Sequence, residues 1–462
     1  MAKVAVIGGG VAGVSASLLL DEDITLFESR DSLISGPPFC HLHAGGNLYP
    51  DISTKECLQL LEESIEFLRL YPFSIDYRPT IITFPKSCEK DPTEFIQRLE
   101  LIKKRYSELV KKDSSNKVLG EVEDYYRVFS KSEILKLKEA KIPKEPRAFE
   151  EWLVSFAKYV NLDSLNEPIV VVNEFGLNLF RLSAASEIAL KNKNNVTLNL
   201  GKKVIDIKKV GDKFLVSYES GDALLQEKFD YIINAAGFLS GKIDDALGFK
   251  RAKYVEFKAA YVTKWRDDIK FAEIIFNGKR GTSKGMAQFT PYKGGYYQLH
   301  GMSKDITLFE NGLVKTENNY SHPKIAKEFI DKIDNGWSRD IATLRTKRAI
   351  EHFSNYIPSF AKEAKVTYVP LYGAQQIPGE NAELRAAEVS FEDRYARCEI
   401  VKVSSAISMA REIAKRFSLN INSDIDNLLK VDDNKIDVKA QEIAKSRNYP
   451  AQLGLILNPK SK

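Results

Sequence analysis

The most constraining feature of the sequence is a glycine pattern that directly follows a short apolar run near the N-terminus. The run Val4–Ile7 has the character of a buried parallel strand, and residues 8–13 then read Gly-x-Gly-x-x-Gly. Residues 12–20 have the composition of a helix, and a second apolar run, residues 24–27, ends at Glu28. This order predicts a βαβ unit that binds a dinucleotide, and it argues against the alternative, a ligand-free glycine turn.

Each member of this unit has a physical task. Gly8 permits the tight turn, Gly10 lets the backbone approach a pyrophosphate, and Gly13 lets the helix pack on the strand. The helix N-terminus presents free N–H groups to phosphate oxygens. Glu28 follows Gly8 by 20 positions, the spacing of a carboxylate that accepts hydrogen bonds from ribose hydroxyls. The contacts expected here are made by Gly8, Gly10, Val11, Ala12, Gly13, Glu28, Ser29 and Arg30.

Length and composition bound the class of protein. A chain of 462 residues can build more than one core, and 44% hydrophobic with 28% charged residues is ordinary for a globular protein. The net charge is only +5 and the basic residues are scattered, so we expect no nucleic-acid partner. We find no signal-peptide pattern and no run of about eighteen apolar residues, and therefore expect no membrane-spanning helix.

The four cysteines show neither disulfide nor metal spacing, so we expect a reducing cytoplasm and no metal site; they are Cys40, Cys57, Cys88 and Cys398. The mild positive charge is also compatible with peripheral contact with the inner face of a membrane.

Periodicity predicts helices over residues 54–70, 92–112, 131–141, 179–190 and 404–417 and in most of 323–350. Strands are expected over residues 75–84, 168–172, 196–200, 203–209, 213–218, 231–233 and 365–370 and in most of 254–300, with a hairpin turn at 293–295.

A second ligand-contacting segment is expected near the middle of the chain. The apolar strand 231–233 runs into Asn234-Ala235-Ala236-Gly237, and such small residues let the backbone come close to another part of the same ligand. A purely structural turn would look the same.

Together with a strand, loop and helix at 395–417, these motifs resemble the D-amino-acid-oxidase-like family of FAD-dependent oxidoreductases. The resemblance covers most of residues 1–417. It implies an α/β fold: a Rossmann-type, glutathione-reductase-like FAD-binding domain and a second α+β substrate domain on a mostly antiparallel sheet. FAD is the implied cofactor. The implied ranges are FAD-binding domain 1–75, 173–250 and 371–420, substrate domain 76–172 and 251–370, and a C-terminal extension 421–462.

The resemblance also implies cofactor contacts outside the first βαβ unit, at His43, Ala44, Gly45, Val204, Ala235, Ala236, Gly237, Ser404, Ser405 and Ala406. Ser404 or Ser405 is expected to cap helix 404–417, the last helix that the resemblance covers. The positive end of this helix would face the flavin. Residues 86–166 and those after 420 contain no motif that we can interpret.

Three residues are candidates for catalysis. Residues 41–46, His-Leu-His-Ala-Gly-Gly, are similar to a loop of flavoenzymes that oxidise 2-hydroxy acids, so His43 is a candidate proton acceptor; the alternatives are a loop histidine or one bonded to the flavin. His300 is either a second acceptor or a core histidine. Arg385 is similar to an arginine that holds a substrate carboxylate, the alternative being a solvated side chain. Arg397 is expected to be free for the site or paired with Glu399 or Asp393.

The leading interpretation is a relative of malate:quinone oxidoreductase and L-2-hydroxyglutarate dehydrogenase that oxidises a small 2-hydroxy acid, malate first. It is expected to pass electrons to a quinone, with oxygen as the alternative acceptor. Those 2-hydroxyglutarate enzymes usually have histidine where Gln288 stands, which weighs against that one substrate. Since no second Gly-x-Gly-x-x-Gly follows a strand, electrons are expected to come directly from an organic substrate. The alternatives are an amino-acid or amine oxidase of the same fold and a non-catalytic FAD-binding protein.

Overall fold

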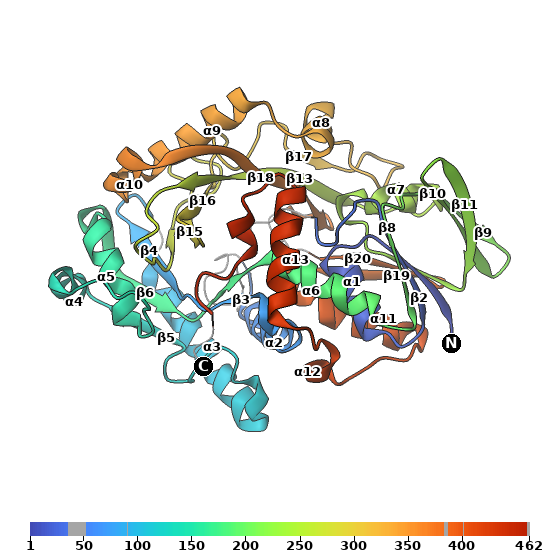
Figure 1. The fold of residues 1–462 in the computed structure, drawn as a ribbon, viewed down its shortest axis with the longest axis horizontal. Coiled ribbons are helices and arrows are strands. Elements are labelled where there is room, and N and C mark those ends of the chain that lie inside the picture. The colour runs from blue at the N-terminus through green and yellow to red at the C-terminus, as the bar shows by residue number, and fades with distance from the viewer. Residues whose placement is uncertain (36–51, 90, 383–386, 401, 460–462) are drawn as a thin grey trace.

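Two large sheets organise the chain (Figure 1). The computed structural model describes residues 1–35, 52–89, 91–382, 387–400 and 402–459. None of the helices in these ranges combines the length and the apolar character that crossing a membrane requires. Of the candidate residues, His43, Ala44, Gly45 and Arg385 lie outside the described residues.

The first sheet has six strands, and its inner strand β1 leads into the glycine turn. The order is β19-β20-β12-β1-β2-β8, and all neighbours are parallel except the edge pair β19 and β20. The strands are β1 (Lys3–Ile7), β2 (Asp23–Glu28), β8 (Val196–Leu200), β12 (Tyr231–Asn234), β19 (Glu388–Glu392) and β20 (Tyr395–Glu399).

Both faces of this sheet are covered, which explains why β1 is apolar at every position after its first residue. Val4 and Val6 pack in the core shared with helices α1 (Val11–Leu19), α2 (Thr54–Leu70), α6 (Leu179–Lys191) and α11 (Ala406–Phe417). Ala5 and Ile7 face the opposite side, where a three-stranded antiparallel meander closes a second core. The meander consists of β9 (Val204–Val210), β10 (Lys213–Ser220) and β11 (Ala223–Phe229). Parallel strands require this two-sided burial.

The second sheet has nine strands and is antiparallel apart from the pair β4 and β14. Its order is β17-β13-β16-β15-β14-β4-β6-β5, and β18 pairs with β13. The strands are β4 (Thr80–Pro85), β5 (Tyr126–Phe129), β6 (Leu165–Val172), β13 (Lys253–Lys264), β14 (Glu273–Phe276), β15 (Ala287–Tyr292), β16 (Tyr296–Gly301), β17 (Leu313–Lys315) and β18 (Lys365–Pro378). The predicted hairpin at 293–295 joins β15 to β16, with Gly294 and Gly295 at positive φ.

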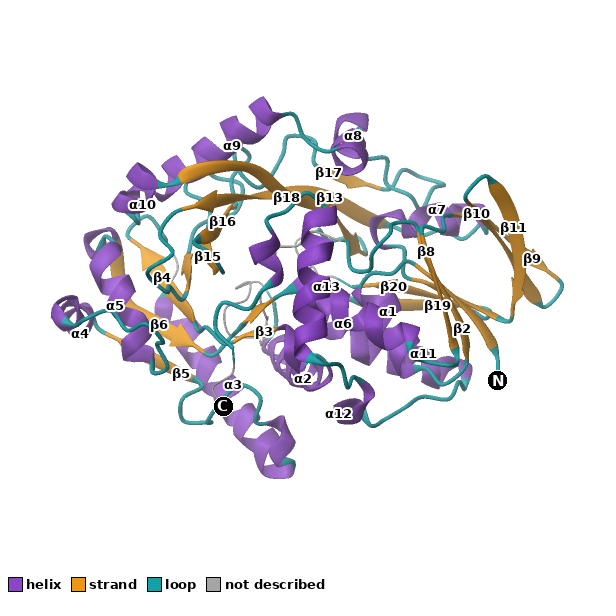
Figure 2. Ribbon diagram, viewed as in Figure 1, coloured by secondary structure: helices purple, strands orange, loops and turns teal. Residues whose placement is uncertain are grey.

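The two faces of the second sheet differ in what covers them. Helices pack on the face that we call the outer face: α4 (Lys131–Lys136), α5 (Phe149–Tyr159), α9 (Arg339–His352) and α10 (Pro358–Glu363). Figure 2 shows α9 along one side of β13 and β18, while α6 and α13 (Asp433–Ser446) lie on the other side, the inner face. The remaining elements are β3 (Ile75–Asp76), β7 (Gly176–Leu177), α3 (Pro92–Lys112), α7 (Ser240–Ala246), α8 (Lys327–Asn335) and α12 (Ile425–Leu428).

Local sequence explains where several helices begin. At the start of α2, Ser53 Oγ accepts a hydrogen bond from the Glu56 N–H (3.2 Å), and the Glu56 carboxylate accepts one from the Ser53 N–H (2.8 Å). The strand expected over 365–370 continues to Pro378, because its whole length pairs with β13. The C-terminal residues, which lacked a motif, form α12, which joins the main core, and α13, which packs against α6.

Candidate functional site

The glycine turn is closed on every side except at Gly10. A Cβ on Gly8, whose φ is +105°, would lie 2.3 Å from the Ala235 carbonyl oxygen, and a Cβ on Gly13 would lie 2.0 Å from the Gly8 oxygen. At Gly10, no heavy atom of the described residues lies within 4 Å of the corresponding point. The turn therefore packs tightly against β12 and α1 and leaves open space at Gly10, where the sequence analysis places a pyrophosphate.

The N-terminus of α1 borders this open space. Its N-cap is Gly10, no side chain in the described part of the chain caps it, and its first turn holds no acidic residue. The N–H groups of Val11 and Ala12 therefore lie at the positive end of the helix without an anionic side chain in that turn. This arrangement suits a phosphate group.

Glu28 is fixed beside the same turn. Its carboxylate accepts hydrogen bonds from the N–H groups of Gly9 and Arg30, both at 2.8 Å, and from Ser29 Oγ at 3.3 Å. The side chain is buried, and the Arg30 guanidinium extends toward the carbonyl of Ile333 in α8 (3.4 Å). The acid thus lies next to the glycine turn, as its spacing predicts.

Two further predicted segments reach the same edge of the first sheet. The Lys202 N–H donates to the Glu28 carbonyl (2.9 Å), which brings the start of β9, Val204, beside the end of β2. Ala235, Ala236 and Gly237 directly follow β12, the strand next to β1. Ligands of parallel α/β sheets bind at such carboxyl ends, where neighbouring strands connect in opposite directions.

The segment before α11 differs from the prediction in its capping. Ser405 stands at the N-cap, but its side chain does not cap the helix, because Ser405 Oγ donates to the Glu63 carboxylate of α2 at 2.6 Å. The prediction that Ser404 or Ser405 caps this helix is therefore wrong. Ser404 is 1% exposed, and its Oγ has no hydrogen-bond partner among the described residues. Ala406 is the first residue of α11 and is buried.

Arg397 forms ion pairs within the fold and is not free for the predicted site. Its buried guanidinium donates to Asp244 of α7, and a second nitrogen lies 3.4 Å from Glu392. The expected partners are engaged elsewhere, since Glu399 pairs with Arg251 at 2.9 Å. The suggested pairing of Arg397 with Glu399 or Asp393 is therefore wrong.

The inner face of the second sheet carries a band of buried polar side chains, which we call the polar band. Its members alternate along their strands with apolar residues of the outer face, as Gln288 does with Phe289. None is more than 7% exposed. The polar band consists of Lys258, Glu273, Gln288, Thr290, Gln298 and His300.

Hydrogen bonds connect His300 to a buried ion pair. The Arg78 guanidinium lies 2.5 Å from one oxygen of Glu273, and the Gln288 amide nitrogen donates to the other oxygen at 2.5 Å. The Gln288 carbonyl oxygen then lies 3.3 Å from His300 Nδ1. We call this chain of contacts, from Arg78 through Glu273 and Gln288 to His300, the relay.

The relay fixes the tautomer of His300. An ionised carboxylate only accepts hydrogen bonds, so the Gln288 group that faces Glu273 must be the NH₂. The Gln288 carbonyl therefore faces His300, and Nδ1 must carry the hydrogen that it accepts. In the neutral imidazole, Nε2 then holds a lone pair and can accept a proton.

Arg78, Glu273 and Lys258 were not among the residues selected from the sequence. For Glu273 and Lys258 the signal is a charged residue in an otherwise apolar strand, such as Lys258 between Phe257 and Ala259, whereas Arg78 lies between β3 and β4 and has no such pattern. Val262 pairs with Gln298, so Lys258 lies on the same face as His300, diagonally across β13 and β16. Lys258 Nζ donates to the Gln375 side chain at 2.6 Å.

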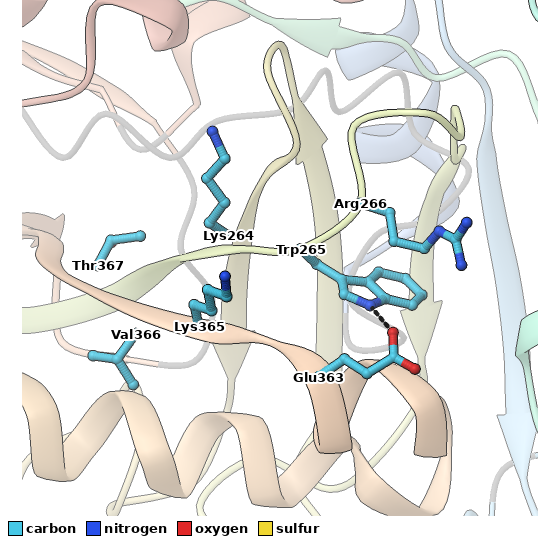
Figure 3. A pocket seen from close by; sticks show the side chains of 7 residues that line it. All are labelled: Lys264, Trp265, Arg266, Glu363, Lys365, Val366 and Thr367. Atoms are coloured by element: carbon cyan, nitrogen blue, oxygen red, sulfur yellow. Dashed lines mark hydrogen bonds between the residues drawn. The ribbon is translucent and has the colours of Figure 1, made fainter.

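An open cavity of about 460 Å³ lies at the far end of β13 (Figure 3). Its lining is Lys264, Trp265, Arg266, Glu363, Lys365, Val366 and Thr367. Trp265 Nε1 donates to Glu363 at 2.9 Å. At its other end, β13 begins at Lys253, which pairs with Glu399 of the first sheet, so about 36 Å of strand separates the cavity from that junction. The cavity therefore lies about one strand length from the junction of the two sheets.

Comparison with known proteins finds the fold but no sequence relative. No protein-family model and no curated protein matches the chain in sequence. Among solved structures, dithionite-reduced L-α-glycerophosphate oxidase from Mycoplasma pneumoniae with FAD bound is 17% identical with a TM-score of 0.58, covering 92% of this chain and 97% of that one. The L-amino acid deaminase from Proteus vulgaris is 11% identical with a TM-score of 0.57 (93% and 97% covered).

L-proline dehydrogenase from P. horikoshii is also similar, with 13% identity, a TM-score of 0.54 and coverage of 97% of this chain and 99% of that one. At these identities the likeness shows the fold. It confirms the predicted fold class, a Rossmann-type domain with a second α+β domain on a mostly antiparallel sheet.

Proposed function

We propose that this chain is an FAD-dependent oxidoreductase that removes a hydride from a small hydroxyl-bearing organic substrate, a 2-hydroxy acid first of all. Three solved structures of the same fold carry the names L-α-glycerophosphate oxidase, L-proline dehydrogenase and L-amino acid deaminase, and the first has FAD bound. The observation that carries the proposal is the relay, which gives His300 a proton-accepting Nε2 on the inner face of the second sheet.

The described residues fit FAD. The open space at Gly10 and the uncapped N-terminus of α1 would take the pyrophosphate, and the fixed Glu28 carboxylate would take the ribose hydroxyls. Ser404, whose buried Oγ has no partner among the described residues, would donate a hydrogen bond to the bound group. The segments at Val204 and Ala235–Gly237 would contact the rest of the molecule through their backbone.

Bound FAD would supply the hydride acceptor. The protein then has to bind the substrate, orient its C–H bond and accept the hydroxyl proton. As hydride leaves the carbon of a 2-hydroxy acid, the O–H bond breaks and the product is the 2-oxo acid. His300 Nε2 takes the released proton, while Glu273 and Gln288 hold the imidazole ring in the orientation and tautomer that this step needs.

The relay favours a hydroxyl over an amine. An amine that binds in its neutral form already has the lone pair that drives hydride departure, whereas a hydroxyl must lose a proton in the same step. Lys258 places a cation on the same face as His300 and would attract a substrate carboxylate.

Arg385 and His43 remain candidates for carboxylate binding and proton transfer. Within the 2-hydroxy acids we propose malate as the first substrate and a quinone as the electron acceptor, with a cytoplasmic location and peripheral membrane contact.

The second candidate is an amino-acid or amine oxidase. It is favoured by two of the structural neighbours, whose names are L-amino acid deaminase and L-proline dehydrogenase. In that case His300 would orient the amine without taking a proton, and the rate of flavin reduction would depend on the protonation of the substrate itself.

A reduction screen tests the proposal. The purified protein is supplied with FAD, freed of excess cofactor and mixed anaerobically with 2-hydroxy acids and with amino acids. We expect yellow protein whose oxidised-flavin absorbance is bleached by a 2-hydroxy acid. Bleaching by amino acids alone would transfer the assignment to the amine oxidases. A yellow protein that no substrate reduces would indicate a non-catalytic FAD-binding protein, and a colourless one would refute the cofactor.

A further inference from the structure

The C-terminal extension reaches the nucleotide end of the candidate site through one arginine. Arg447 directly follows α13, and its guanidinium donates to Ser32 Oγ (2.8 and 3.1 Å), to the Leu33 carbonyl (2.5 Å) and to the Ile34 carbonyl (3.1 Å). Burial lowers the pKa of Arg447 to about 10, so it remains a cation at neutral pH. The arginine is therefore a partly buried charged donor that binds a short segment, residues 32–34.

The segment that Arg447 holds is strained. Ile34 has a φ of +54°, a left-handed conformation that a β-branched residue rarely adopts. Such a conformation persists only where surrounding contacts enforce it. Here the Ile34 side chain is 3% exposed in the main core, its N–H donates to the Gly9 carbonyl at 2.8 Å, and its own carbonyl accepts from Arg447. Ile34 is thus fixed on one side by the glycine turn and on the other by the extension.

This contact continues to the acid expected at the ribose. Gly9 accepts from the Ile34 N–H through its carbonyl and donates through its own N–H to Glu28 Oε2 at 2.8 Å. A Cβ on Gly9 would lie 2.6 Å from the Leu33 side chain and 2.9 Å from Glu28 Oε2, so these groups are in tight contact. A shift of residues 32–34 would therefore move both Gly9 and Glu28.

We propose that Arg447 is a positioning residue of the cofactor site: it clamps residues 32–34 in their strained conformation and so sets the position of Gly9 and Glu28 for the adenosine half of the dinucleotide. The inference rests on the proposed FAD site. It adds that the C-terminal extension is part of that site.

The extension docks independently of this clamp. Asn178, at the start of α6, donates to the carbonyls of Leu453 (2.9 Å) and Leu455 (3.0 Å), and Arg181 pairs with Asp433 at 2.9 Å. Replacement of Arg447 should therefore leave the extension in place. This separates a positioning role from a general loss of structure.

The test compares FAD dissociation constants of folded variants by flavin fluorescence. Arg447→Met should weaken FAD binding by about 10- to 30-fold, the effect of losing a partly buried charged hydrogen-bond donor. Arg447→Lys, which keeps the charge and some of the donors, should recover part of that loss. Arg69→Met is the matched control, because Arg69 also makes four hydrogen bonds, ties Asp426 of the extension to α2 and lies away from residues 32–34. It should change FAD affinity by less than about threefold.

A double-mutant cycle with Ile34→Gly tests the strain directly. Glycine adopts positive φ without cost, so a clamp is needed less in that background. In the Ile34→Gly background, the loss of FAD affinity caused by Arg447→Met should shrink to about threefold. The effect of the cavity left by the isoleucine is present in both members of that comparison and therefore cancels. Equal FAD affinity in wild type and Arg447→Met, or equal losses in Arg447→Met and Arg69→Met, would overturn the inference. If the wild type itself takes up no FAD, the proposed function fails, a result distinct from both of these.

Discussion

The two faces of the nine-stranded sheet are built from the same strands but meet different demands. On the outer face of β15 and β16, Phe289 and Tyr297 stack at 4.7 Å between ring centroids, within a large core under α5, α9 and α10. On the inner face of the same strands, Gln288 and His300 belong to a hydrogen-bonded relay that ends in a buried ion pair. One face therefore resembles an ordinary protein core, and the other does not.

This difference separates what folds the sheet from what it does. Burying apolar side chains stabilises the fold in proportion to the area removed from water. A buried ion pair with its polar neighbours rarely stabilises a protein more than apolar residues of the same size would. Polar residues kept on one face of an otherwise apolar sheet are therefore better explained by chemistry than by stability.

The largest expected effect on stability comes from the outer face. Phe289→Ala should lower the free energy of unfolding by about 3–5 kcal/mol, because a buried aromatic ring that also contacts Phe360 is lost. FAD affinity of the protein that remains folded should be unchanged within about threefold. Urea unfolding and flavin fluorescence measure the two quantities. If Phe289→Ala were as stable as wild type, the outer face would not be the face that stabilises the fold.

On the inner face, His300→Gln should act on rate instead. We expect flavin reduction by a 2-hydroxy acid to slow by about 10²- to 10⁴-fold, the usual contribution of a proton acceptor. The free energy of unfolding should change by about 1 kcal/mol or less, since glutamine keeps a polar group at this position. Anaerobic stopped-flow absorbance and urea unfolding give the two numbers, and a variant that is unstable yet reduced at the normal rate would reverse the assignment.

His322 lies in the connection between β17 and α8 and belongs to neither face of the sheet. It predicts how the free energy of unfolding depends on pH in the acid range. Burial, with Lys242 and Lys253 nearby, lowers the pKa of His322 from 6.5 to about 4. Between these values the unfolded chain binds a proton that the folded chain does not, so stability falls as the pH drops from about 6.5 to 4, by an amount on the order of 3 kcal/mol. His322→Gln should flatten this dependence in urea titrations at several pH values. An unchanged pH dependence in that variant would exclude the histidine as its source.

The smallest expected effect concerns orientation within the polar band. Gln288→Met removes the acceptor at His300 Nδ1 and should slow flavin reduction by about tenfold, because the proton-accepting tautomer is no longer fixed. Gln298→Met is the matched control, since Gln298 lies on the same face but accepts from Tyr292 (3.0 Å) outside the relay. Equal rates in the two variants would remove Gln288 from the relay's function.

Sequence alone predicted the parts of the molecule that are encoded locally. The glycine turn, α1 and Glu28 lie within 28 residues of the N-terminus and follow from spacing and periodicity. The relay could not be predicted from sequence, because its residues meet only through strand pairing. Arg78 and Glu273 are 195 positions apart and meet only because β4 pairs with β14. Arg447 and Ser32 are 415 positions apart, and no pattern in either segment indicates the contact.

The polar band's chemistry is tested most directly by the pH dependence of flavin reduction in wild type and in His300→Gln, measured anaerobically with the 2-hydroxy acid that bleaches the protein fastest. The account predicts that the wild-type rate rises with pH as one group loses its proton, and that this rise disappears in His300→Gln. A variant that keeps the wild-type pH profile would contradict the assignment of His300 as the proton acceptor.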